Sequence, residues 1–197
     1  MKKLFILLAV VMCWKFFWAD ETVVLGPGIK VVEAPIQIEL NNAVKIQYKG
    51  FQITPLAEFQ LTGKILSRKD YSFGRESELS PTDLALGWGP MSDEAVLENI
   101  DISQSGRWYR WRVEDFPIPR KAIETNSANM HLVPANDLVA SMLELTKQGQ
   151  IIELTGYLIR VDADDGWHWQ SSLTRNDTGG QACELIYVES LHVIKQF

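Results

Sequence analysis

The chain has 197 residues, of which 46% are hydrophobic and 22% charged, and its formal net charge is −6. This composition is sufficient for one folded domain with a core and argues against a disordered chain. No glycine period, heptad or repeated block occurs, which argues against collagen, coiled coil and solenoid folds.

The first nineteen residues have the pattern of a targeting segment. Basic residues at positions 2 and 3 precede an apolar run, 4–14, that has the length of a signal-peptide core. Cleavage after Ala19 would need a small residue where Phe17 stands, so we expect residues 1–19 to be retained as a signal-anchor or transmembrane segment. Lipidation at Cys13 is the alternative, but Met12 occupies a position that requires a small residue.

A retained segment fixes the expected location of the rest of the chain. Residues 4–18 would enter the bilayer, with Lys2 and Lys3 inside and an aromatic belt at the far side. We therefore predict a single-pass protein of the inner (cytoplasmic) membrane whose domain faces the periplasm or cell exterior.

Beyond residue 19 the formal charge is about −9. An acidic body gains nothing from counterion release, so we expect neither nucleic acid nor an anionic membrane surface as a partner. Cys183 is the only cysteine after the anchor, which excludes a disulfide within the domain. The simplest interpretation of its thiol is a small buried apolar group.

The segment 20–44 is punctuated by proline and glycine and predicts an extended tether, with the domain spanning 45–197. A strand pair is expected at 45–48 and 51–54. A half-buried strand follows at 58–66, where apolar and polar residues alternate.

Helical signals come next. Ser80 as a cap, Pro81 in the first turn and acidic Asp83 predict a helix that Gly87 closes. Further helices are expected at 93–99 after Ser92, at 119–125, and at 137–147 after Asn136 as the cap.

The later strands are expected at 107–113, 128–133, 150–161, 167–173 and 183–194. Gly63 and Gly156 lie inside strands, where glycine typically marks a bulge or a close backbone approach. Asp165-Gly166 is a hairpin signal. Apart from an extra hairpin strand, the order from 58 onward is three strands, a helix and two strands, which is that of an OB-type barrel. We therefore predict an α+β fold, mainly antiparallel sheet, as an OB-like small barrel with short helical insertions.

Four stretches resemble an uncharacterised bacterial family of N-terminally anchored envelope proteins. They are SPTDLALGWGPM (80–91), DISQSG (101–106), SANMH (127–131) and WQSSLTR (169–175). The resemblance covers residues 52 to 194 and implies a bacterial envelope setting and a shared domain. The family has no assigned activity, so the resemblance implies no catalytic residue.

A surface rich in tryptophan and arginine is the strongest candidate site. Strand alternation puts Trp108, Arg110 and Arg112 on one face of 107–113 and Arg107, Tyr109 and Trp111 on the other. Such rings stack on sugars or unpaired bases, and arginines bind carboxylates or phosphates. The alternative is that these side chains fill the core. The predicted ligand-binding residues are Trp88, Trp108, Arg110, Arg112, Trp167, Trp169 and Arg175.

Three other constellations are weaker. Cys183 with His131 or His192 would form a nucleophilic pair, but the neighbouring Glu184 disfavours a thiolate. The histidines and carboxylates (His131, His168, His192, Asp162, Asp164 and Asp165) lack metal-ligand spacing, so no metal or other cofactor is expected. The glycine-rich stretch 171–180 has the composition of a hairpin loop more than of an anion nest.

These patterns favour a membrane-tethered extracytoplasmic binding or accessory module that recognises a peptide, glycan or envelope protein. A thiol-dependent envelope enzyme that uses Cys183 with His131 is the alternative.

Overall fold

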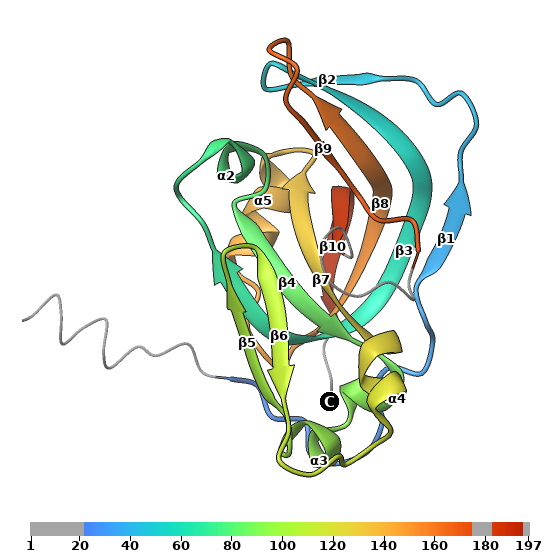
Figure 1. Cartoon of the computed structure of the whole chain (residues 1–197), viewed down its shortest axis with the longest axis vertical. Coiled ribbons are helices and arrows are strands. Elements are labelled where there is room, and N and C mark those ends of the chain that lie inside the picture. Colours follow the sequence, from blue (N-terminus) through green and yellow to red (C-terminus); the bar gives the residue numbers. More distant parts are fainter. Residues whose placement is uncertain (1–21, 175–182, 195–197) are drawn as a thin grey trace, which may run out of the picture.

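The computed structural model describes residues 22–174 and 183–194, which form one α+β domain built mainly of antiparallel sheet (Figure 1). The strands are β1 (Ile36–Glu39), β2 (Ile46–Tyr48), β3 (Phe51–Asp70), β4 (Thr82–Gly87), β5 (Asp101–Ser105), β6 (Trp108–Arg112), β7 (Ser127–Pro134), β8 (Ile151–Asp162), β9 (His168–Gln170) and β10 (Glu184–Ile194). The helices are α2 (Arg75–Leu79), α3 (Glu94–Leu97), α4 (Arg120–Thr125) and α5 (Asp137–Glu144), with a 3-10 turn η1 (Gly89–Ser92).

Five of these strands close into a barrel. The strand β3 pairs with β4, β4 with β7, β7 with β10, and β10 with β8, which returns to β3. The β7–β10 pair is parallel, whereas the other four pairs are antiparallel. Helix α5 lies in the connection between β7 and β8. The prediction of an OB-like small barrel is therefore confirmed.

The barrel interior is filled by alternating residues of its strands. Side chains such as Leu61, Leu84, Met130 and Leu154 form the central apolar cluster. At Gly156 a Cβ atom would clash with the Tyr187 carbonyl, and β10 is bulged beside it, between Val188 and Ser190. The expected close backbone approach at Gly156 is thus confirmed, because the two strands can approach there only without a side chain.

A second sheet lies outside the barrel. The strands β5 and β6 form a hairpin of their own (Figure 1), which packs on β3 and β4 through a separate apolar cluster around Leu66, Ala85 and Met91. The cluster also takes in Ile123 of α4. The hairpin and α4 therefore cover part of the outer surface of the barrel.

Two element predictions are wrong, and they are linked. Thr82–Gly87, within the predicted helix, forms strand β4, and 107–113 contributes to the outer hairpin instead of the barrel. All six residues of β4 are buried because its inner face packs in the barrel and its outer face lies beneath the hairpin. Tertiary packing on both faces overrides the local helix signals.

Smaller differences concern the helices. The cap of α3 is Asp93, whose side chain accepts a hydrogen bond from the Ala95 amide, rather than Ser92. In α5 the predicted cap Asn136 is confirmed, since it accepts from the Val139 amide. Leu138 and Leu145 are exposed, because the buried face of this helix is formed by Val139 and Leu143.

The described part of the predicted tether is attached to the barrel. The strand β1 pairs with β3, and Val31 is buried in the central cluster. The predicted anchor, 1–19, lies outside the described residues. Within the described ranges, no helix has both the length and the apolar character needed to cross a bilayer.

Candidate binding site

The β5–β6 hairpin is shaped by a tight turn. Gly106 and Arg107, the two turn residues between Ser105 and Trp108, both have positive φ angles, 57° and 68°. Two such residues give a turn whose twist matches that of the flanking strands. The turn places Arg107 at the tip of the hairpin.

Strand alternation on β6 follows the sequence prediction. Trp108, Arg110 and Arg112 are exposed on the outer face, whereas Tyr109 and Trp111 pack inward on the barrel. Arg112 pairs with Asp101 across the hairpin, and Arg110 donates to the Ser105 hydroxyl at 2.7 Å.

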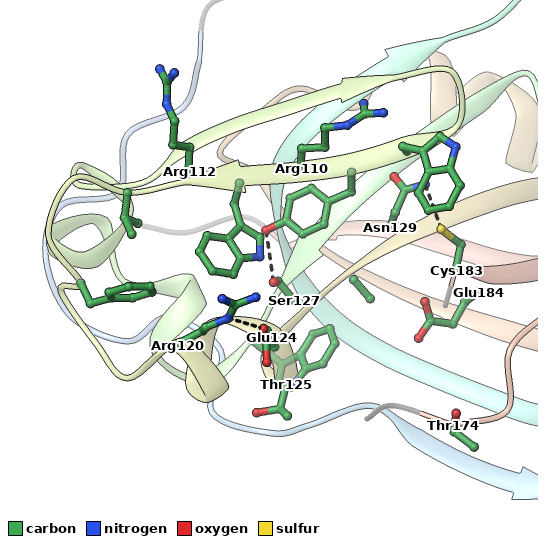
Figure 2. A pocket seen from close by; sticks show the side chains of 17 residues that line it. Arg110, Arg112, Arg120, Glu124, Thr125, Ser127, Asn129, Thr174, Cys183 and Glu184 are labelled. Atoms are coloured by element: carbon green, nitrogen blue, oxygen red, sulfur yellow. Dashed lines mark hydrogen bonds and ion pairs between the residues drawn. The ribbon is translucent and has the colours of Figure 1, made fainter. Parts of the chain in front are cut away.

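A pocket of about 620 Å³ lies beside β6, on the side away from β5. Its other walls are α4 and the first residues of β7 and β10 (Figure 2). The volume is in the range of ligand-binding clefts. The lining residues are Trp88, Trp108, Tyr109, Arg110, Trp111, Arg112, Val113, Phe116, Arg120, Glu124, Thr125, Ser127, Ala128, Asn129, Thr174, Cys183 and Glu184.

One half of the pocket is aromatic. Trp111 and Phe116 meet edge to face with ring centroids 6.2 Å apart, and the Arg120 guanidinium lies 5.7 Å from the Trp111 ring centre. Arg120 also donates to Glu124 at 2.8 Å. This wall therefore offers ring faces with a cation and a carboxylate beside them, a combination that suits an amphipathic ligand.

The hairpin is joined to the barrel in the pocket by Tyr109, a partly buried tyrosine. The Tyr109 hydroxyl donates to Ser127 Oγ at 3.2 Å, and Ser127 in turn donates to the Ile123 carbonyl. Burial raises the pKa of Tyr109 to about 12, and the Ser127 hydrogen bond opposes this shift. The phenol is therefore neutral at ordinary pH and acts as a fixed hydrogen-bond donor.

The other end of the pocket is polar. Asn129 donates to the Arg107 carbonyl at 3.2 Å and accepts from Gln104 at 2.6 Å. The Cys183 sulfur lies 3.8 Å from Asn129 Nδ2 and 4.0 Å from the Arg107 carbonyl oxygen. Glu184, next to it on β10, is buried.

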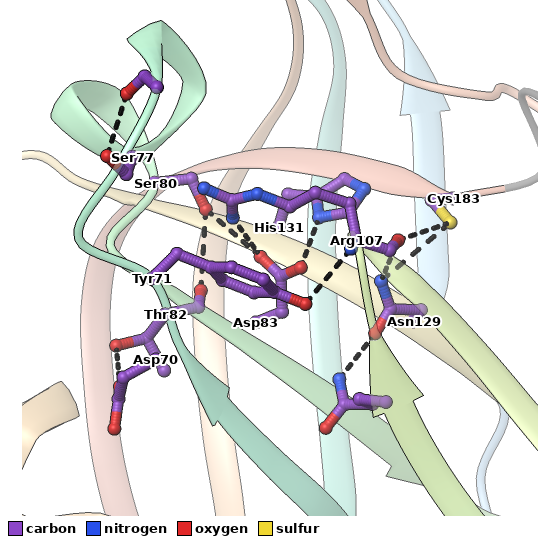
Figure 3. A network of polar contacts seen from close by, with 12 residues as sticks. Asp70, Tyr71, Ser77, Ser80, Thr82, Asp83, Arg107, Asn129, His131 and Cys183 are labelled. Atoms are coloured by element: carbon purple, nitrogen blue, oxygen red, sulfur yellow. Dashed lines mark hydrogen bonds and ion pairs between the residues drawn. The ribbon is translucent and has the colours of Figure 1, made fainter.

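A buried ionic network lies beneath the hairpin tip (Figure 3). Asp83 of β4 has no exposed surface and accepts from Arg107 Nη1 at 2.6 Å. The other oxygen of Asp83 lies 3.0 Å from His131 Nδ1, without the alignment of a hydrogen bond. The Arg107 amide donates to the Tyr71 hydroxyl, and the guanidinium stacks on the Tyr71 ring at 3.9 Å.

The structure divides the predicted ligand-binding residues into two groups. Trp88, Trp108, Arg110 and Arg112 line the pocket. Trp167 and Trp169 lie instead next to each other in the apolar cluster with Phe51. Arg175 lies outside the described residues.

The other predicted residues are also located. The His131 ring packs on Trp169 at 4.8 Å and faces Asp83, while the Cys183 contacts given above are with Asn129 and Arg107. Asp162 pairs with Arg160, and Asp165 with Arg75. Within 22–174 and 183–194, no three His, Cys, Asp or Glu side chains gather as metal ligands would.

Sequence reasoning missed several pocket residues. Phe116, Arg120 and Glu124 come from a segment that carries no site pattern of its own, and only the tertiary fold brings this segment to the pocket that the Trp111 ring also lines. The i, i+4 spacing of Arg120 and Glu124 predicts an ion pair on a helix but does not indicate a pocket.

The comparisons with known proteins add no family. None of the protein-family models matches the chain, and no curated protein is similar to it at a significant level.

Proposed function

We propose that the chain is a membrane-tethered, extracytoplasmic binding module, and that the pocket between β6, α4 and the barrel holds its ligand: a peptide, a glycan or a segment of an envelope protein. The observation that carries the proposal is the pocket itself, in which the exposed Phe116 and the Trp111 ring lie beside Arg120. Membrane attachment is supported by the sequence of residues 1–19.

The position of the pocket on the fold supports the same proposal. OB barrels bind oligosaccharides and oligonucleotides over the face of their second and third strands. These strands are β4 and β7 here, and the pocket is built against the start of β7. The acidic charge of the chain favours peptides or glycans over nucleic acid.

The thiol-enzyme alternative has less support. A nucleophilic pair needs the base within hydrogen-bond reach of the thiol. The Cys183 contacts given above are with Asn129 Nδ2 and the Arg107 carbonyl oxygen, and the His131 ring packs on Trp169. These contacts support a binding surface more than a thiol–imidazole pair.

Two exposed phenylalanines provide the test. Phe116 lines the pocket and is 53% exposed, whereas Phe73 is 92% exposed and does not line it. The full-length chain in mild detergent would be screened against immobilised synthetic peptides and soluble peptidoglycan fragments. We expect Phe116→Ala to weaken binding of the retained ligand by roughly tenfold. Phe73→Ala, the matched control, is expected to bind like the wild type.

The test can also fail clearly. If both variants bind as tightly as the wild type, the ligand occupies another surface and the pocket assignment is wrong. Circular dichroism of the variants shows whether the fold is retained, and loss of fold is not expected because both side chains are largely exposed.

A further inference from the structure

The outer edge of β6 is an unpaired strand edge. The strand β6 pairs with β5 alone among the described strands. No residue of β5 lines the pocket, whereas every residue of β6 does, including side chains from both of its faces. The pocket therefore runs along the edge of β6 and not over one of its faces.

The hairpin register shows which backbone groups point to this edge. A two-residue turn joins Ser105 and Trp108, which makes them a hydrogen-bonded pair. Because such pairs alternate with non-hydrogen-bonded ones, the amide and carbonyl groups of Tyr109 and Trp111 point away from β5. No hydrogen bond of these groups to another described residue is found.

We infer that the ligand of the pocket is an extended peptide segment that adds to β6 as a further strand. This inference rests on the proposed function and specifies its ligand class. The backbone groups of Tyr109 and Trp111 supply the main-chain hydrogen bonds, and the aromatic wall receives alternate side chains, as in other cases of strand addition.

The charges at the edge indicate the composition of this segment. Residues added opposite Arg110 and Arg112 would have their side chains on the exposed face with the two arginines. Acidic side chains suit these positions, and apolar side chains suit the alternate positions that face Tyr109 and Trp111. A second copy of the chain is a poorer occupant, because the Arg110 and Arg112 side chains of both copies would come close together.

The main test separates edge pairing from other binding in the pocket. The probe is a fluorescently labelled synthetic peptide of alternating valine and glutamate, with the length of β6, titrated with the full chain in mild detergent. Two further versions carry backbone N-methyl groups on every second residue, in the two possible phases. Only one phase removes the amides that face β6. We expect that phase to lose binding at least about tenfold and the other to stay within about twofold.

A charge exchange provides the second test. Replacing glutamate by lysine in the peptide is expected to weaken its binding to the wild type. The variant carrying both Arg110→Glu and Arg112→Glu is expected to reverse this preference. Equal preference in the two proteins would overturn the acidic assignment.

The remaining outcomes are distinguishable. If the peptide binds and Phe116→Ala weakens it, but both N-methyl phases behave alike, the edge pairing is wrong and the pocket assignment remains. If glycan fragments bind in the pocket and peptides do not, this inference is overturned and the proposed function stands. A chain that binds no peptide and sediments as a dimer overturns the inference in favour of a second copy.

Discussion

The fully buried carboxylate of Asp83 contacts two basic side chains that come from different elements. Arg107 comes from the hairpin tip and His131 from β7, and Arg107 is 18% exposed. A buried charge that loses its partner keeps its desolvation cost without compensation. The Asp83 carboxylate is therefore expected to stabilise the attachment of the hairpin to the barrel.

The chain offers a matched pair for testing this. Asp83→Asn keeps the side-chain shape and removes the charge opposite Arg107, so we expect the free energy of unfolding to fall by about 3–5 kcal/mol. The control is Asp101→Asn, because Asp101 pairs with an arginine of the same hairpin but is 76% exposed. Its effect should stay below about 1 kcal/mol. Urea unfolding of both variants gives the comparison, and equal losses would contradict a special role for Asp83.

On the scale of an element, the hairpin is also held by Tyr109, whose pKa burial raises from 10.0 to about 12. The unfolded chain releases this proton at lower pH than the folded chain does. The stabilising contribution is therefore complete below about pH 10 and is lost as the pH rises towards about pH 12. Between these two pH values the free energy of unfolding should fall by about 1.4 kcal/mol per pH unit.

This pH dependence can be assigned with Tyr109→Phe. The wild type and the variant would be unfolded in urea between about pH 9 and about pH 11.5. The slope of the unfolding free energy against pH is then compared between the two proteins, and the difference is set against the value expected from linkage. The other tyrosines affect both proteins alike. Parallel pH profiles of the two proteins would show that Tyr109 does not titrate as its burial requires.

The same hairpin shows what sequence patterns can and cannot predict. The outward Trp108, Arg110 and Arg112 follow from alternation within one strand. The location of the strand does not, because an isolated hairpin and a barrel strand share the same local pattern. The Ser80 to Asp83 stretch has the pattern of a helix start. In the structure, however, Asp83 is the buried partner of Arg107, which lies 24 residues away in the sequence.

For the candidate-site residues, too, the local sequence pattern does not predict the tertiary location. Trp88, Trp108, Arg110 and Arg112 were predictable as an aromatic and cationic set, and they do line the pocket. Trp167 and Trp169 have the same local character but pack around Phe51 and His131. Residue type and alternation predict which side chains can bind a ligand, whereas the tertiary pairing of distant elements decides which of them meet.

On the scale of the whole molecule, the segment before β1 is hydrogen-bonded to the rest of the domain at several points. The Val23 amide donates to the Gln148 carbonyl, and the Leu25 amide to Glu94, which also pairs with Lys64. Further along, the Ser92 hydroxyl accepts from the amides of Lys30 and Val31. This segment therefore contributes to the stability of the domain.

Two glycines with similar backbone angles test this attachment. Gly149 and Gly50 have φ values of 87° and 82°, so alanine causes backbone strain of about 1 kcal/mol at either site. At Gly149 the added Cβ would also clash with the Val23 carbonyl, whereas nothing lies near Gly50. We expect Gly149→Ala to cost more unfolding free energy than Gly50→Ala and to abolish hydrogen-exchange protection of the Val23 amide. If the two variants lose equal stability and keep that protection, the segment does not stabilise the barrel, and a tether that starts at residue 20 becomes the better description.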